Sequence, residues 1–193
     1  MIIGVSGKAR SGKNTFADFL VDVFYTRFNR KFILMAFADE LKYLCKAQFN
    51  LSYDQLWGSA KEEADKRYVK RTGGFWTARE IMQSVGEFYR SINYNYWVEL
   101  LDRNIKEGNV RDVIVTDVRY PNEFNYIKQN NGVVIRIYRD NAPTIHGTDH
   151  PSERSLDDFD DDVFDVVVGN NGGLNDLYLT AYNAAESIIS LEG

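Results

Sequence analysis

Short apolar runs alternate with longer amphipathic segments along the chain, and this alternation predicts a parallel sheet joined by helices. The apolar runs occupy residues 2–5, 31–37, 112–116, 132–138 and 163–168. Apolar residues at helical spacing cover about 15–29, 77–92, 95–106, 121–129 and 174–190. Strands that alternate with helices in this way are typical of α/β domains with helices on both faces of the sheet.

Two segments fit no strand–helix unit. Residues 51–75 are charged and helical in patches, notably over 61–71, whereas residues 140–162 show little periodicity. Long insertions in compact domains are usually functional or mobile. We therefore expect a single domain over 1–193 with a substrate-binding insertion at about 39–95 and a lid at about 139–162. Asp39 is expected to cap the first helix of the insertion.

The first apolar run leads into the spacing G-x-x-x-x-G-K, from Gly7 to Lys13, and then into a helix expected from about Thr15. A strand, this loop and a helix form the context of a phosphate-binding P-loop. The glycines allow successive N–H groups to point at phosphate oxygens, and Lys13 can contact the β- and γ-phosphates. The sequence therefore predicts nucleotide binding.

Asn14 stands where a P-loop normally has a Ser or Thr that binds Mg²⁺. Either Thr15 replaces that hydroxyl, or phosphates, water and a distant acid hold the metal. The loop also carries Lys8 and Arg10, and one of these two cations can reach a second phosphorylated substrate.

The composition of the chain excludes several classes of protein. The 193 residues hold a net charge of −5, which argues against binding of a nucleic-acid polymer. No apolar run is long enough to span a membrane, and the chain starts directly in the first strand, so a signal peptide is not expected. A single cysteine, Cys45, excludes an internal disulfide framework and suits a reducing cytoplasm, and its helical context favours a packed thiol.

Asp117 follows the third apolar run directly, at the sheet edge where α/β proteins place their sites. It is a candidate Mg²⁺ ligand through water, with a helix cap or solvated turn as the alternative. Arg119 and Glu123 follow it, and Glu123 lies in the first turn of a helix opened by Pro121. Glu123 either interacts with the helix dipole or binds an acceptor substrate.

The helix expected from Thr77 begins with a capping box, Thr77 and Glu80. Four of its residues recur at intervals of three and four and share one face: Arg79, Gln83, Gly86 and Arg90. This face is either a ligand surface or a solvated polar face. Trp97 begins the next helix, where core packing is favoured over stacking on a base.

The acidic run 157–162 is interpreted as a solvated loop. His146 and His150 are expected to face solvent.

Four blocks of the chain resemble the bacteriophage deoxynucleoside monophosphate kinases, in the order of that family. They are VSGKARSGKNTFADFL, WTAREIMQSVGEFYRSINYNYWVELL, VIVTDVRYPNE with GVVIRI, and HPSERSLDD. The family typically has Asp where Asn14 stands. The resemblance implies a three-layer P-loop kinase fold with a central parallel sheet, an acceptor-binding arm and a lid. It also implies that Mg²⁺ is the cofactor and that ATP is the co-substrate. The resemblance is compatible with a homodimer, and it places a phage-encoded enzyme in the host cytoplasm.

The resemblance, together with the patterns above, gives a set of candidate residues. ATP is expected on Gly7, Arg10, Ser11, Gly12, Lys13, Asn14 and Thr15, and the metal on Asn14, Thr15 and Asp117. The acceptor is expected on Lys8, Lys42, Trp76, Arg79, Gln83, Gly86, Arg90, Trp97, Arg119 and Glu123. The catalytic set is Lys13, Arg10, Asp117 and Arg119, and the lid candidates are Arg136, Arg139, His150 and Glu153.

The function expected from the sequence is ATP-dependent phosphorylation of deoxynucleoside 5′-monophosphates to diphosphates. Two alternatives stay open. One is a kinase of the phosphomevalonate type, which shares the G-K-x-x-S-G-K loop and a similar C-terminal block, ERSLDDFDD. The other is a P-loop ATPase or switch that hydrolyses ATP without an acceptor.

Overall fold

The computed structural model describes residues 1–140 and 150–191, and the chain divides into two compact units. The sheet unit comprises Met1–Ala36 and Leu101–Gly193, and the inserted unit comprises Phe37–Leu100. None of the helices in the described part of the chain is long and apolar enough to cross a membrane.

Five parallel strands form the centre of the sheet unit. They are β1 (Ile2–Ser6), β2 (Ile33–Met35), β5 (Val113–Val118), β6 (Val133–Tyr138) and β7 (Val166–Gly169), in the spatial order β2-β5-β1-β6-β7. Because all neighbouring pairs are parallel, the loops that follow β1, β5, β6 and β7 leave the sheet at one edge. This edge collects the site residues of the sheet unit.

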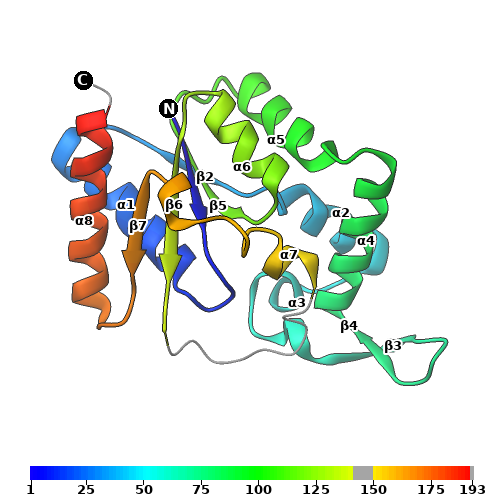
Figure 1. Ribbon diagram of the computed structural model, residues 1–193. Coiled ribbons are helices and arrows are strands. Elements are labelled where there is room, and N and C mark those ends of the chain that lie inside the picture. Colours follow the sequence, from blue (N-terminus) through cyan, green and yellow to red (C-terminus); the bar gives the residue numbers. More distant parts are fainter. Residues whose placement is uncertain (141–149, 192–193) are drawn as a thin grey trace. The chain divides into compact units, whose positions relative to one another are not determined.

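Helices cover both faces of this sheet (Figure 1). Helices α1 (Lys13–Phe28) and α8 (Leu174–Leu191) pack on one face, where Phe16 and Phe24 of α1 are fully buried. Helix α6 (Pro121–Gln129) packs on the other face, against β1 and β6. The short α7 (Pro151–Arg154) and the 3₁₀ turn η2 (Asp161–Val163) precede β7.

The inserted unit is helical with one β-hairpin. Its elements are α2 (Asp39–Phe49), α3 (Tyr53–Trp57), η1 (Ala60–Glu62), the antiparallel pair β3 (Ala64–Val69) and β4 (Phe75–Thr77), and α4 (Ala78–Ile92). Helix α5 (Tyr96–Glu107) runs across the boundary between the units. A small core surrounds Cys45 and Leu56, so Cys45 is the packed thiol that the sequence predicted. Burial raises its pKa to about 11.

The α/β class with a central parallel sheet is confirmed, but several boundaries differ from the predicted ones. Helix α1 begins at Lys13 rather than Thr15. The second strand is only Ile33–Met35, because it lies at the sheet edge and pairs with β5 alone. Residues 161–163 form a 3₁₀ turn, so the last strand begins at Val166. Helix α2 is capped by Ala38, and Asp39 is its first residue instead of its cap.

The helical prediction over residues 61–71 is wrong, because Ala64–Val69 form strand β3. The cause is tertiary: Asp65 is buried and accepts hydrogen bonds from Arg67 and from Gln55 of α3. Residues two apart share a face on a strand but not on a helix. The Asp65–Arg67 contact therefore fits the extended backbone.

Candidate active site

The loop between β1 and α1 has the backbone of a phosphate-binding loop. Gly12 is the N-cap of α1 in the left-handed conformation, with φ 94°, and Gly7 also has a positive φ, at 154°. A Cβ atom on Gly7 would lie 2.2 Å from the carbonyl oxygen of Ile137. Helix α1 has no acidic residue in its first turn and, within the described chain, no side-chain cap hydrogen bond. Its N-terminal N–H groups and dipole favour an anion there.

Lys13 lies inside this loop. Its Nζ donates to the carbonyl oxygens of Gly7 at 2.6 Å and Lys8 at 2.7 Å, and the residue is 8% exposed. The pKa of Lys13 is lowered to about 7, first by burial and then by the Arg119 cation, while the carboxylates of Glu153 and Asp117 act in the opposite direction. An anion at this position would restore the charged form.

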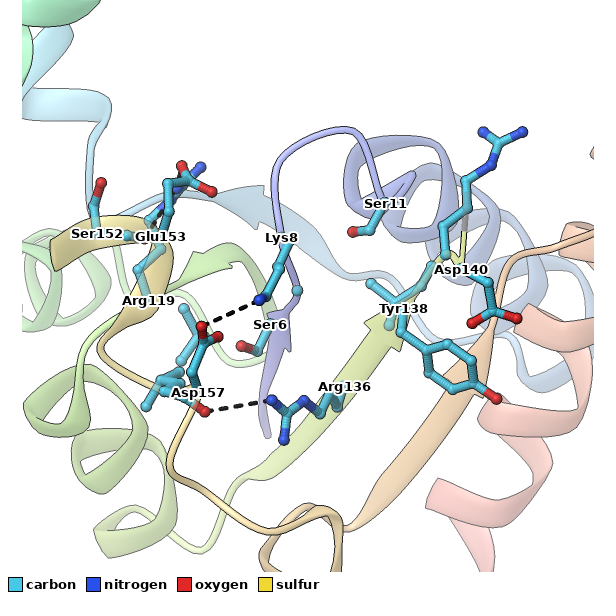
Figure 2. Close-up of a pocket in the computed structure, with 15 residues that line it drawn as sticks. Ser6, Lys8, Ser11, Arg119, Arg136, Tyr138, Asp140, Ser152, Glu153 and Asp157 are labelled. Atoms are coloured by element: carbon cyan, nitrogen blue, oxygen red, sulfur yellow. Dashed lines mark hydrogen bonds and ion pairs between the residues drawn. The ribbon is translucent and has the colours of Figure 1, made fainter. Parts of the chain in front are cut away.

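A pocket of about 310 Å³ adjoins the loop (Figure 2). It is lined by the loop after β1, by the ends of β5 and β6, and by residues 152–157. Lys8 reaches Asp157 across it, with 3.1 Å between Nζ and Oδ2. The hydroxyl of Ser11 also lines the pocket and, among the described residues, is buried without a hydrogen-bond partner. A donor of this kind suits an incoming phosphate oxygen.

Two further charged residues, Arg119 and Glu153, line this pocket, and Glu123 supports the turn that carries Arg119. The Arg119 guanidinium pairs with Glu153, whose second oxygen accepts the Ala9 N–H at 3.1 Å. Burial alone would raise the pKa of Glu153, but Arg119, Lys13 and the Ala9 N–H hold it below its usual range. Glu123 is buried and accepts the backbone N–H groups of Arg119 and Tyr120 at 2.7 and 3.1 Å. These contacts shape the turn after β5.

The predicted metal ligands present oxygen donors of the kind that Mg²⁺ prefers. Asp117 lies within the carboxyl end of β5, rather than after it, and acts electrostatically on Lys13. Asn14 and Thr15 lie in the first turn of α1. The donor chemistry therefore fits a hard divalent cation beside the phosphates.

The lid candidates divide into fixed and exposed side chains. Arg136 donates to the carbonyl oxygen of Phe159 at 2.7 Å, pairs with Asp161 at 3.1 Å, and lies over the ring of Phe164. Arg139 is exposed at the pocket rim. His150 Nδ1 accepts the Ser152 N–H at 3.2 Å and so caps α7.

Residues 141–149 of the predicted lid, including His146, lie outside the described residues. The aspartates of the acidic run are exposed, as the solvated interpretation predicted, and two of them form surface ion pairs, Asp157 with Lys8 and Asp161 with Arg136.

The inserted unit holds most of the predicted acceptor residues. On α4, Arg79 pairs with Glu62, and Arg90 lies 3.6 Å from Glu87. The amide nitrogen of Gln83 is buried without a hydrogen-bond partner among the described residues. The other members are Gly86, Trp97, Lys42 and Trp76.

Trp97 is 3% exposed and donates its indole N–H to the Gly86 carbonyl at 3.2 Å, so in this structure it packs in the core. Lys42 lies 3.4 Å from Asp39, and the ring of Trp76 lies beneath Lys70. The predicted acceptor residues of α4 thus lie in the inserted unit, whereas Lys8, Arg119 and Glu123 lie in the sheet unit. Their predicted role in binding the acceptor stays a prediction.

Sequence reasoning missed Asn170, which directly follows β7 and is buried. Its side-chain amide donates to the carbonyl oxygen of Ser11 in the P-loop at 2.9 Å. The available signal was its position, since polar residues at the carboxyl end of a parallel strand lie at the site edge.

The sheet, its order and the loop around Lys13 define a P-loop phosphotransferase. Residues 34–181 match the family model described as deoxynucleotide monophosphate kinase. The chain is 32% identical over 195 residues to the "Putative deoxynucleotide monophosphate kinase" of Acanthamoeba polyphaga mimivirus, covering 92% of each chain. The chain therefore belongs to the deoxynucleotide monophosphate kinase family, and the enzyme is a nucleotide kinase.

Two more distant matches accompany these. The deoxynucleoside-5′-monophosphate kinase of Escherichia phage T5 is 26% identical over 116 residues, which is 56% of this chain and 46% of that protein. The solved structure of dephospho-CoA kinase from Campylobacter jejuni aligns with a TM-score of 0.46 and 13% identity, over 97% of this chain and 96% of that one.

Proposed function

We propose that the enzyme transfers the γ-phosphoryl group of ATP to the 5′-phosphate of a deoxynucleoside monophosphate and releases a deoxynucleoside diphosphate and ADP. The observation that carries this proposal is the P-loop around Lys13, with no acidic residue in the first turn of α1, in a chain of this family.

The sheet unit binds the phosphates of ATP. Lys13 exchanges its bonds to the Gly7 and Lys8 carbonyls for the β- and γ-phosphates. The remaining ATP ligands are Gly7, Arg10, Ser11, Gly12, Asn14 and Thr15. Mg²⁺, held partly through water by Asn14, Thr15 and Asp117, would supply positive charge between the phosphates. Catalysis then rests on alignment and neutralisation of charge, because the acceptor phosphate oxygen is already nucleophilic at neutral pH.

The acceptor ligands that we propose are taken from the residues expected from the sequence. From the inserted unit they are Lys42, Trp76, Arg79, Gln83, Gly86 and Arg90, and from the sheet unit Lys8, Arg119 and Glu123. Trp97, expected from the sequence in the same set, is buried and is assigned a packing role instead. Arg10 and Arg119 join Lys13 in neutralising the transferring group. Arg139, His150 and Glu153 belong to a lid over residues 139–162, and Arg136 of β6 acts with them. This lid excludes water, since water would otherwise accept the phosphoryl group. We further propose a cytoplasmic location, and a homodimer stays open.

The deciding experiment measures ADP release with Mg-ATP and one candidate acceptor at a time. The acceptors are dTMP, dGMP, dAMP, dCMP, their ribose forms and phosphomevalonate. Release that depends on particular deoxynucleotides supports the proposal and gives the base specificity. Release without any acceptor would favour an ATPase, and release with phosphomevalonate alone would favour the small-molecule kinase.

A further inference from the structure

Asn170 connects the end of the last strand to the P-loop, 159 residues earlier in the chain. It is 7% exposed, and its own backbone N–H donates to the carbonyl oxygen of Tyr138 at 2.8 Å. Its side-chain Nδ2 donates to the carbonyl oxygen of Ser11 at 2.9 Å, and this bond is buried. Asn170 is therefore held through its backbone while its amide holds the loop.

The atom that Asn170 binds sets the orientation of the next N–H group. The peptide between Ser11 and Gly12 is planar and trans, since no peptide bond in the described chain is cis. In a trans peptide the carbonyl and the N–H point in opposite directions. Holding the Ser11 carbonyl toward Asn170 therefore turns the Gly12 N–H away from Asn170, at the N-terminus of α1.

The fit between Asn170 and Gly12 is close. A Cβ atom on Gly12 would lie 2.3 Å from Asn170 Nδ2, and Gly12 already has the left-handed φ of 94°. The neighbouring Ser11 N–H is used within the loop, where it donates to the carbonyl oxygen of Lys8 at 3.2 Å. The Gly12 N–H is thus the N–H group at the N-terminus of α1 whose direction is set by the bond from Asn170 to the Ser11 carbonyl.

We propose that Asn170 is a positioning residue for phosphate binding: its amide fixes the Ser11–Gly12 peptide so that the Gly12 N–H is presented to the phosphate chain of the nucleotide. This inference rests on the proposed function of the P-loop. Asn170 itself does not touch the nucleotide. Its amide acts only through the backbone that it holds.

Two variants and one matched control test this role. Asn170→Asp keeps the shape but places a carboxylate oxygen against the Ser11 carbonyl, and Asn170→Ala removes the donor without adding charge. Asn130→Asp is the control, because Asn130 also donates its amide to a backbone carbonyl, that of Tyr126 at 2.8 Å, at the end of α6. Calorimetric titration gives the Kd of each protein for ATP and for inorganic tripolyphosphate, after circular dichroism has checked folding.

Both Asn170 variants are expected to weaken ATP and tripolyphosphate by similar factors of about tenfold or more, which is the size expected for one bond to a charged group. Asn130→Asp should bind both like the wild type. The KM for the deoxynucleotide at saturating ATP should not change. A loss of ATP binding that exceeds the loss of tripolyphosphate binding would place the effect outside the phosphates and overturn the inference.

The pH dependence adds a readout that a purely structural role would not give. In Asn170→Asp, burial and the facing carbonyl raise the pKa of the introduced carboxyl, and its protonated form can donate to Ser11 again. The ratio of the variant Kd to the wild-type Kd should therefore fall as the pH is lowered, whereas Asn170→Ala should keep a constant ratio.

Wild-type affinity for tripolyphosphate in folded Asn170→Asp and Asn170→Ala would overturn the inference while leaving the P-loop function intact. If Asn170→Asp does not fold, Asn170→Ala decides alone. A wild-type protein that binds neither ATP nor tripolyphosphate would refute the proposed function and this inference together.

Discussion

The carboxylate of Glu153 pairs with the guanidinium of Arg119 and so joins α7 to the turn that follows β5. The Arg119 side chain is only 25% exposed and the Glu153 side chain 5%, so solvent screens this pair weakly. The second carboxylate oxygen of Glu153 accepts the N–H of Ala9 in the P-loop. One side chain thus holds three segments of the site edge together.

We predict that Glu153→Gln lowers the free energy of unfolding by about 1–3 kcal/mol at pH 7, because the amide cannot match a carboxylate against a buried cation. Since the folded state holds the pKa of Glu153 below its usual range, its contribution is present above about pH 4.3 and is lost as the pH falls further. Urea unfolding of the wild type and the variant at several pH values measures this.

The difference between the two proteins should therefore shrink on acidification. Glu107→Gln, at an exposed position of α5, serves as the control and should match the wild type throughout. A stability difference that stays constant down to pH 3 would contradict the assignment to the carboxylate.

Replacement of Lys13 by alanine is predicted to abolish phosphoryl transfer, with a fall in kcat of at least about 100-fold, while the fold stays intact. The reason is the loss of the lysine whose Nζ is held inside the loop by the carbonyl oxygens of Gly7 and Lys8. Lys106→Ala is the control, because Lys106 is an exposed lysine on α5 paired with Asp102. Wild-type turnover in a folded Lys13→Ala protein would refute the P-loop argument.

A proton should be taken up when ATP binds near pH 8. The pKa of Lys13 is lowered to about 7, so at pH 8 its side chain is largely the neutral amine. Beside the phosphates this amine takes up a proton and becomes the charged ammonium. Calorimetric titration in two buffers with different ionisation enthalpies measures this uptake. Lys13→Met should bind ATP without it, and an equal uptake in that variant would assign the proton to another group.

The same pKa sets how the stability of the protein without nucleotide depends on pH. Between about pH 7 and pH 10.4 the unfolded chain binds more protons at Lys13 than the folded chain does. The free energy of unfolding contributed by this residue therefore rises with pH across that window. Lys13→Met should lose this rise, which urea unfolding at pH 7 and pH 9 would detect.

Local signals explain which parts of the fold the sequence predicted. The apolar runs of β1, β5 and β6 and the Thr77–Glu80 capping box act within a few residues, and the structure has each of them near its predicted place. Pro121 likewise opens α6 as expected. Such patterns are readable because the periodicity of burial is local.

Contacts between distant residues explain what the sequence could not give. Strand β3 owes its extended form to the bond between Asp65 and Gln55 and to pairing with β4, neither of which is visible in its charged sequence. Asp157 meets Lys8 across 149 residues, and Asn170 meets Ser11 across 159. A single sequence shows neither pairing, because loop residues have no periodicity that reports a partner.

On α4, Arg79→Ala is predicted to raise the KM for the deoxynucleotide by about tenfold or more, with little change in the Kd for ATP. A guanidinium suits a phosphate because it offers several donors in a planar fork. Arg103→Ala, at an exposed arginine of α5, is the control for loss of a surface cation. If Arg79→Ala changed only the unfolding midpoint, Arg79 would be a structural partner of Glu62.

Asp65→Asn is predicted to lower the unfolding midpoint of the protein at pH 7. The hydrogen bonds from Arg67 hold the pKa of Asp65 far below its usual range, with Gln55 adding a further bond. The stability that Asp65 provides is therefore present above about pH 3.9 and lost only as the pH falls below it. Glu63→Gln, at an exposed neighbouring position, should leave the midpoint unchanged.

A substitution of Trp97, in the first turn of α5, distinguishes a packing role of this residue from a role in binding the acceptor. Trp97→Phe keeps an aromatic ring but removes the N–H that donates to the Gly86 carbonyl, and it leaves a smaller side chain in the core. We predict a loss of about 1–2 kcal/mol in the free energy of unfolding. The KM for the deoxynucleotide should not change, because the Trp97 side chain is buried. Steady-state kinetics beside urea unfolding measure both quantities, with Arg79→Ala as the positive control for KM. A raised KM at unchanged stability would instead make Trp97 a ligand of the acceptor.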